Sequence, residues 1–147
     1  KNMLEKNSTI VFPRQLLKAE PFLKLTKAGL HMLIMFYCRR RMKWMRSSQY
    51  WKIINNGEIV LPYGEVQKKL GVSRKTISRA IDQLVEYGFI DITHAGGGMN
   101  GDCSKYHISD RWELYGTEDF IKKFREKDTR CKITPKNWEK IKKGNRK

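Results

Sequence analysis

Six side chains that can donate hydrogen bonds or carry positive charge lie within seven residues of the chain. They are Ser73, Arg74, Lys75, Thr76, Ser78 and Arg79. Arginine and lysine donate to guanine acceptors in the major groove of DNA and to phosphate oxygens, and hydroxyl groups can contact either. Positions 73–79 contain no acid. These residues therefore predict a contact with double-stranded DNA.

The surrounding sequence predicts a helix over residues 74–87 that would position this cluster. Ser73 is a good N-cap residue, and Gly88 suits a left-handed C-cap. Apolar residues at three- and four-residue spacing define a buried face of the helix: Ile77, Ala80, Ile81, Leu84 and Val85. The cations fall on the other side, in the first two turns, where a recognition helix reaches base edges.

Two further features extend this motif. A compact helix ending at Leu70 and the turn Gly71-Val72 come before it, giving two helices joined by a tight turn. After it, residues 89–93 and 105–108 predict two strands joined by a glycine segment. Such a strand pair can reach an adjacent groove or the phosphates. The candidate contacts there are His94, Asn100 and Lys105.

Three further motifs lie outside this segment: residues 12–17 (Phe-Pro-Arg-Gln-Leu-Leu), residues 55–59 (Asn-Asn-Gly-Glu-Ile) and residues 106–112 (Tyr-His-Ile-Ser-Asp-Arg-Trp). With them, residues 10–115 resemble the winged helix-turn-helix family, in particular the versions in phage and plasmid replication proteins. The resemblance implies an α+β fold with a three-helix core, a small antiparallel sheet and a glycine-rich wing. It also implies DNA binding. We expect this domain to span residues 1–115 and a basic helical C-terminal extension to span residues 116–147.

The positive charge is concentrated in two segments. Residues 21–57 carry eight Lys or Arg and no acid, and residues 120–147 carry twelve against three acids. This distribution favours a polyanionic partner over a diffuse solubilising surface. We also see no apolar stretch long enough to span a bilayer, so the composition indicates nucleic acid and no membrane.

A long apolar helix is expected from Thr26 to about residue 42, as the central buried element. A basic, aromatic connection over residues 43–52 follows it. Its rings, Trp44, Tyr50 and Trp51, either stack on unpaired bases or pack over the core as a flap, and packing is the favoured interpretation.

Two short helices are expected after Trp112. Thr117 would cap the first, with Phe120, Ile121 and Phe124 as its packing side chains, and Thr134-Pro135 would open the second. With too few apolar residues for a core of their own, they would dock on the domain or fold on binding a partner. A second copy of the chain or a replication protein is the expected partner.

Catalytic and metal-binding patterns are weak. Cys38, Cys103 and Cys131 are widely spaced, which predicts free thiols and a cytoplasmic location, in a bacterium or in the host cell of a mobile element. His94, Cys103 and His107 match no standard zinc spacing, and three ligands would be incomplete. We predict no enzymatic activity, no metal and no cofactor.

Three hypotheses for function follow. The favoured one is a sequence-specific double-stranded DNA-binding protein of a mobile element, acting in replication initiation or transcription regulation. The second is a nucleic-acid-organising or virion-associated structural protein with little sequence preference. The third is the DNA-binding part of a larger DNA-processing enzyme whose catalytic domain lies outside this sequence.

Overall fold

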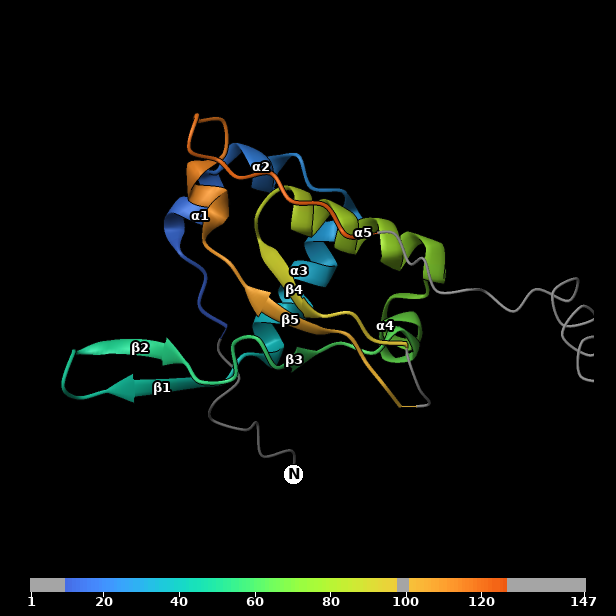
Figure 1. The fold of residues 1–147 in the computed structure, drawn as a ribbon, viewed down its shortest axis with the longest axis horizontal. Helices are drawn as coiled ribbons and strands as arrows, with labels where there is room; N and C mark the ends of the chain where they lie inside the picture. The colour runs from blue at the N-terminus through green and yellow to red at the C-terminus, as the bar shows by residue number, and fades with distance from the viewer. Residues whose placement is uncertain (1–9, 98–100, 127–147) are drawn as a thin grey trace, which may run out of the picture.

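The computed structural model describes residues 10–97 and 101–126, which form a mixed helix and strand fold of the α+β class (Figure 1). The helices are α1 (Arg14–Lys18), α2 (Glu20–Leu23), α3 (Lys27–Arg39), α4 (Tyr63–Leu70) and α5 (Arg74–Glu86), with a 3-10 turn at Arg111–Leu114. The strands are β1 (Met42–Met45), β2 (Tyr50–Ile53), β3 (Ile59–Val60), β4 (Ile90–His94) and β5 (Lys105–Ile108). The predicted α+β class is confirmed. None of the described helices is long and apolar enough to cross a membrane.

Helices α3 and α5 pack against each other at the centre of the core. All five apolar residues predicted for the inner face of α5 are buried, which confirms that face. The buried large side chains of α3 are Met32, Leu33, Phe36 and Tyr37. Tyr106 of β5 packs edge-on against Phe36 with 5.0 Å between ring centroids. Burial raises the pKa of Tyr106 to about 12.

A hydrogen-bonded junction fixes the start of α3 against α5. Thr26 caps α3 by accepting from Gly29 N at 3.1 Å, and its hydroxyl donates to Gln83 Oε1 at 2.9 Å. The same Gln83 oxygen accepts from Thr26 N at 3.1 Å. A Cβ at position 29 would lie 2.7 Å from that oxygen, so glycine there permits this contact. The junction holds α5 at a defined angle to the rest of the core.

The main sheet has the order β3-β5-β4, with both neighbours antiparallel to β5. Asn56 extends the sheet from the loop before β3, because its side chain accepts from Ile108 N at 2.7 Å and donates to Ile108 O at 3.0 Å. Gly88 joins α5 to β4 at φ +84, where a Cβ would lie 2.8 Å from Trp112 N. The predicted left-handed end of the helix is therefore confirmed.

The segment after α3 differs from the prediction. The helix ends at Arg39 instead of continuing to about residue 42, because Arg40 adopts extended backbone angles. Residues 42–53 then form an antiparallel β1–β2 hairpin in place of an irregular connection. Asn55 anchors its base by accepting from Arg41 N at 2.7 Å and donating to Arg39 O at 3.0 Å.

The hairpin projects away from the body of the molecule (Figure 1). Its rings remain exposed, with 43% of Trp44, 49% of Tyr50 and 61% of Trp51 accessible. The favoured expectation that they cover the core as a flap is therefore wrong.

The first helix expected after Trp112 is absent: residues 117–119 form a bend and a turn, and residues 120–126 are irregular. The Thr117 hydroxyl donates to Leu114 O at 2.7 Å instead of capping a following helix. Arg111 Nη1 donates to Ile121 O at 2.7 Å, which occupies a carbonyl that a helix would use internally. The second expected helix, at residues 134–144, lies outside the described residues.

Candidate nucleic-acid interface

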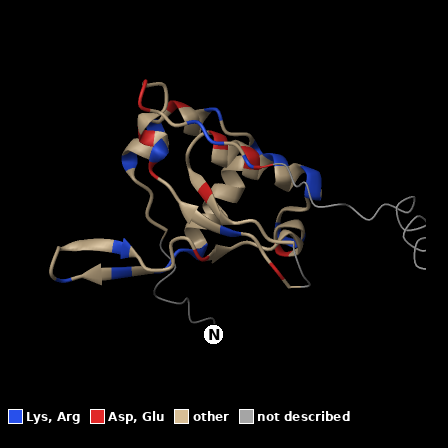
Figure 2. Ribbon diagram, viewed as in Figure 1, with Lys and Arg blue, Asp and Glu red and all other residues tan. Residues whose placement is uncertain are grey.

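The first two turns of α5 present a cationic surface at one end of the molecule (Figure 2). Arg74, Lys75 and Arg79 are all exposed. None of the three forms an ion pair with any residue that the structure describes. The predicted cluster therefore lies together on one surface, and its charge is not neutralised by neighbouring acids.

The hydroxyl groups at the start of α5 form its cap. Ser73 Oγ accepts from Thr76 N at 3.2 Å, which confirms the predicted N-cap, and Ser73 Oγ lies 3.0 Å from Thr76 Oγ1. Ser73 is exposed, whereas Thr76 is half-buried. The cap orients the first helical turn, and the exposed Ser73 lies beside the arginines where a phosphate could approach.

Arg74 is held by the preceding helix. Its Nε donates to Gln67 Oε1 at 3.3 Å across the α4–α5 turn, where Gly71 adopts φ +64. With Nε engaged by Gln67, the two terminal nitrogens of Arg74 remain available as a fork for a planar pair of acceptors. Helical spacing and capping patterns in the sequence give no signal for this positioning contact between α4 and α5.

Ser78 is less accessible than the sequence suggests. It is half-buried, and Arg125 donates to its Oγ. The same guanidinium pairs with Asp82 at 2.8 Å and donates to the Tyr63 hydroxyl at 3.2 Å. A contact between Ser78 and DNA would therefore require Arg125 to move. Sequence patterns give no signal for this contact, because Arg125 is 47 residues from Ser78.

Basic residues of the C-terminal segment neutralise the acids on and beside the later turns of α5. Lys122 pairs with Glu86 at 2.8 Å, and this hydrogen bond raises the pKa of Lys122. Asp91 pairs with Arg111 at 2.7 Å and with Lys123 at 3.2 Å. Burial would raise the pKa of Asp91, but the hydrogen bonds from these two cations outweigh it and hold the pKa below its ordinary value.

The loop between β4 and β5 carries the other predicted contacts. His94 Nε2 lies 2.7 Å from Asp102 Oδ1, and Lys105 pairs with Glu58 at 2.5 Å. Asn100 lies outside the described residues. Both described side chains are thus engaged with carboxylates, so this loop offers less open positive charge than the start of α5.

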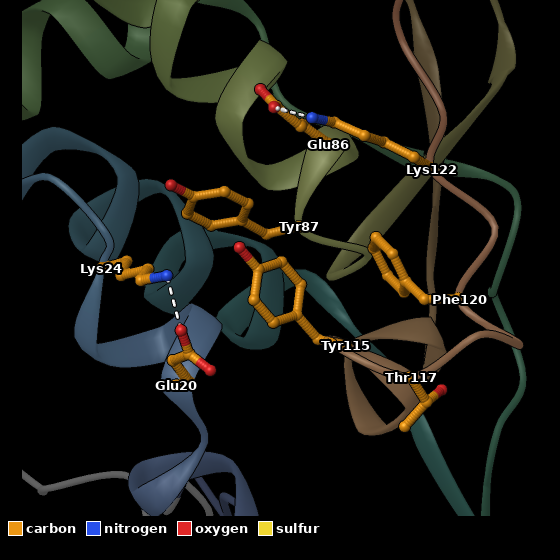
Figure 3. A pocket seen from close by; sticks show the side chains of 9 residues that line it. Glu20, Lys24, Glu86, Tyr87, Tyr115, Thr117, Phe120 and Lys122 are labelled. Atoms are coloured by element: carbon orange, nitrogen blue, oxygen red, sulfur yellow. Dashed lines mark ion pairs between the residues drawn. The ribbon is translucent and has the colours of Figure 1, made fainter.

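A shallow pocket of about 390 Å³ lies where the C-terminal segment meets α2 and the end of α5 (Figure 3). The rings of Tyr87 and Tyr115 meet edge-on in it, with centroids 5.6 Å apart. Its two acids are paired, Glu20 with Lys24 and Glu86 with Lys122. The C-terminal segment itself forms one wall of the pocket, and the lining residues include no nucleophile paired with a base.

The zinc alternative gains no support from the geometry. Among residues 10–97 and 101–126, no group of three His, Cys, Asp or Glu side chains lies close enough to hold a metal ion. His94 is hydrogen-bonded to Asp102, and His107 Nε2 lies 3.3 Å from Asn56 Nδ2. Cys38 and Cys103 are free thiols.

Comparisons of the chain with models of known protein families, with curated proteins and with solved structures give no match.

Proposed function

We propose that this chain is a sequence-specific double-stranded DNA-binding protein of the winged helix-turn-helix type, with α5 as its recognition helix. The observation that carries this proposal is the separation of charge along α5. Its first two turns present exposed cations with no acid partner among the described residues, whereas the acids further along are paired with the C-terminal segment. In a recognition helix, the N-terminal residues are the ones that contact base edges, and here these residues are cationic and exposed.

The order of the elements supports the same proposal. The chain runs α3, β3, α4, α5, β4, β5, and β3 pairs with β5. In a winged helix-turn-helix arrangement, α4 and α5 would be the two helices of the motif and the β4–β5 hairpin would be the wing. The junction of Gln83 with Thr26 would keep α5 rigid against the core, as a reading element requires.

A role in replication initiation or transcription regulation of a mobile element is part of the proposal. It is supported by the resemblance of residues 10–115 to phage and plasmid replication proteins. A second candidate, an organising protein with little sequence preference, is favoured by the basic residues outside α5. Residues 127–147 add nine Lys or Arg against two acids.

Selection of bound fragments from a random duplex library and from fragmented genomic DNA tests the proposal. Enrichment of one shared motif is expected, at an origin for a replication role and at a promoter for a regulatory role. Retention of all sequences in proportion to length would favour the organising protein and contradict sequence-specific reading.

A further inference from the structure

The β1–β2 hairpin has two different faces. Directly paired residues share a face, and successive residues alternate between faces. Trp44 pairs with Trp51 on one face, and Lys43 pairs with Lys52 on the other. The two indole rings have centroids 5.5 Å apart at an interplanar angle of 59°, and both are exposed. One face of the hairpin is thus an exposed pair of indole rings, and the other carries two lysines together with Tyr50.

The cations of the hairpin are not neutralised. Arg41, Lys43, Arg46 and Lys52 make no ion pair with any residue in the described part of the chain. Lys43 and Lys52 lie directly opposite each other in the hairpin. Like charges in such a pair destabilise antiparallel strands. A bound polyanion would remove that repulsion. The exposed rings and the uncompensated charge therefore favour the same class of ligand.

We propose that the hairpin is a second nucleic-acid site, which binds single-stranded DNA by stacking unpaired bases on Trp44 and Trp51. Exposed aromatic rings beside cations are the usual means of binding unpaired bases with little sequence preference, since every base has a π-face. The ribbon is only two strands wide, so the flexible lysine side chains reach round its edges to the phosphates of the stacked strand.

The position of the hairpin makes this site distinct from α5. The hairpin and the start of α5 lie at opposite ends of the long axis of the molecule (Figure 1). Asn55 anchors the base of the hairpin through Arg41 N and Arg39 O, so its direction is built into the fold. A protein that holds a duplex at one end would hold a separated strand at the other. The single-strand site does not depend on the proposed role of α5.

Two other occupants fit less well. A second copy of the hairpin would bring further cations into the contact, because residues 21–57 contain no acid. A lipid surface would suit the tryptophans, but the tip of the hairpin is Arg46, Ser47, Ser48 and Gln49, which is polar. An inserting hairpin would be expected to lead with apolar residues.

The test uses the full chain with a deoxythymidine oligonucleotide, followed by intrinsic tryptophan fluorescence and by anisotropy of a labelled strand. Trp51→Ile keeps a β-branched apolar residue in the strand but removes the stacking surface. Tyr50→Ile is the matched control, because Tyr50 is a similarly exposed ring on the opposite face. We expect Trp51→Ile to weaken the oligonucleotide Kd about 5- to 150-fold. Tyr50→Ile should change it by less than about 2-fold, and Trp51→Phe should recover most of the affinity.

Four further measurements decide the outcome: duplex binding of Trp51→Ile, oligonucleotide binding of Arg79→Ala, vesicle binding and sedimentation. The binding of Trp51→Ile to the selected duplex should be unchanged, and that of Arg79→Ala to the oligonucleotide should be unchanged, so each site can fail alone. Equal losses for Trp51→Ile and Tyr50→Ile on the oligonucleotide would overturn the proposal. Unchanged oligonucleotide binding by Trp51→Ile would also overturn it. In that case, lost binding to phosphatidylglycerol vesicles would indicate a lipid surface as the partner, and a change from dimer to monomer in sedimentation would indicate a second copy of the chain.

Discussion

Replacing Arg79 by alanine separates the reading of DNA from the stability of the fold. Arg79 is exposed, its side chain makes no hydrogen bond or ion pair with the described residues, and alanine is at least as good a helix former. The free energy of unfolding should therefore change by less than about 0.5 kcal/mol. If the guanidinium makes a bidentate contact with guanine, affinity for the selected duplex should fall by roughly 1–3 kcal/mol, about 5- to 150-fold in Kd.

Arg74→Ala should have a similar effect on binding. Gln67→Ala, which removes only the Gln67 restraint on Arg74, should cost less than about 1 kcal/mol. The matched control is Arg14→Ala, an exposed arginine of α1 that forms no ion pair with the residues the structure describes, and this change should leave specific binding unchanged. Anisotropy titrations at one salt concentration measure the Kd of each variant for the selected duplex and for a scrambled duplex. Equal losses for Arg79→Ala on the two duplexes would mean that α5 touches only phosphate.

Three other substitutions or truncations test other parts of the structure. Ile81→Ala should lower the free energy of unfolding by about 2–5 kcal/mol, because the side chain is fully buried between α3 and α5; a chemical denaturation curve measures it. Asp91 has a lowered pKa in the folded state, so its stabilising effect is present above the unfolded pKa and is lost as pH falls through the folded one. Asp91→Asn should therefore lower the melting temperature at neutral pH and flatten its dependence on pH below about 4; parallel curves for the two proteins would contradict this. Truncation after Glu126 removes nine Lys or Arg and two acids, so the slope of log affinity against log salt should become shallower by roughly 2–4, with the specific-to-random ratio nearly unchanged. An unchanged slope would show that the tail does not contact phosphate.

The parts of the fold that could be predicted from sequence are those set by local chemistry. Ser73 and Thr26 cap the helices for which they were predicted, and Gly88 ends α5 in a left-handed conformation. The buried face of α5 followed from helical spacing. Local signals of this kind do not depend on contacts between distant residues.

The errors came where contacts between distant residues or cross-strand pairing decide the structure. The helix expected at Thr117 is replaced by irregular chain because Lys122, Lys123 and Arg125 reach acids on α5 and β4. The β1–β2 hairpin was missed because its strands have only four residues each. A signal for it was present in the alternation of Met42-Lys43-Trp44 and of Trp51-Lys52-Ile53 on either side of a polar turn. The grouping of cations at the start of α5 was predicted correctly. The contact of Arg125 with Ser78 and the pairing of Glu58 with Lys105 could not be predicted, because these residues are far apart in the sequence.

The most direct test of major-groove reading by α5 is a double-mutant cycle between protein and DNA. Each guanine of the selected duplex is replaced in turn by 7-deazaguanine, which lacks the N7 acceptor, and the Kd is measured with the unaltered chain and with Arg74→Ala and Arg79→Ala. If α5 reads the groove, one guanine should couple to one arginine by roughly 1–2 kcal/mol, so that losing N7 costs little once that arginine has been replaced by alanine. Strictly additive losses at every guanine, with both arginines, would contradict this account.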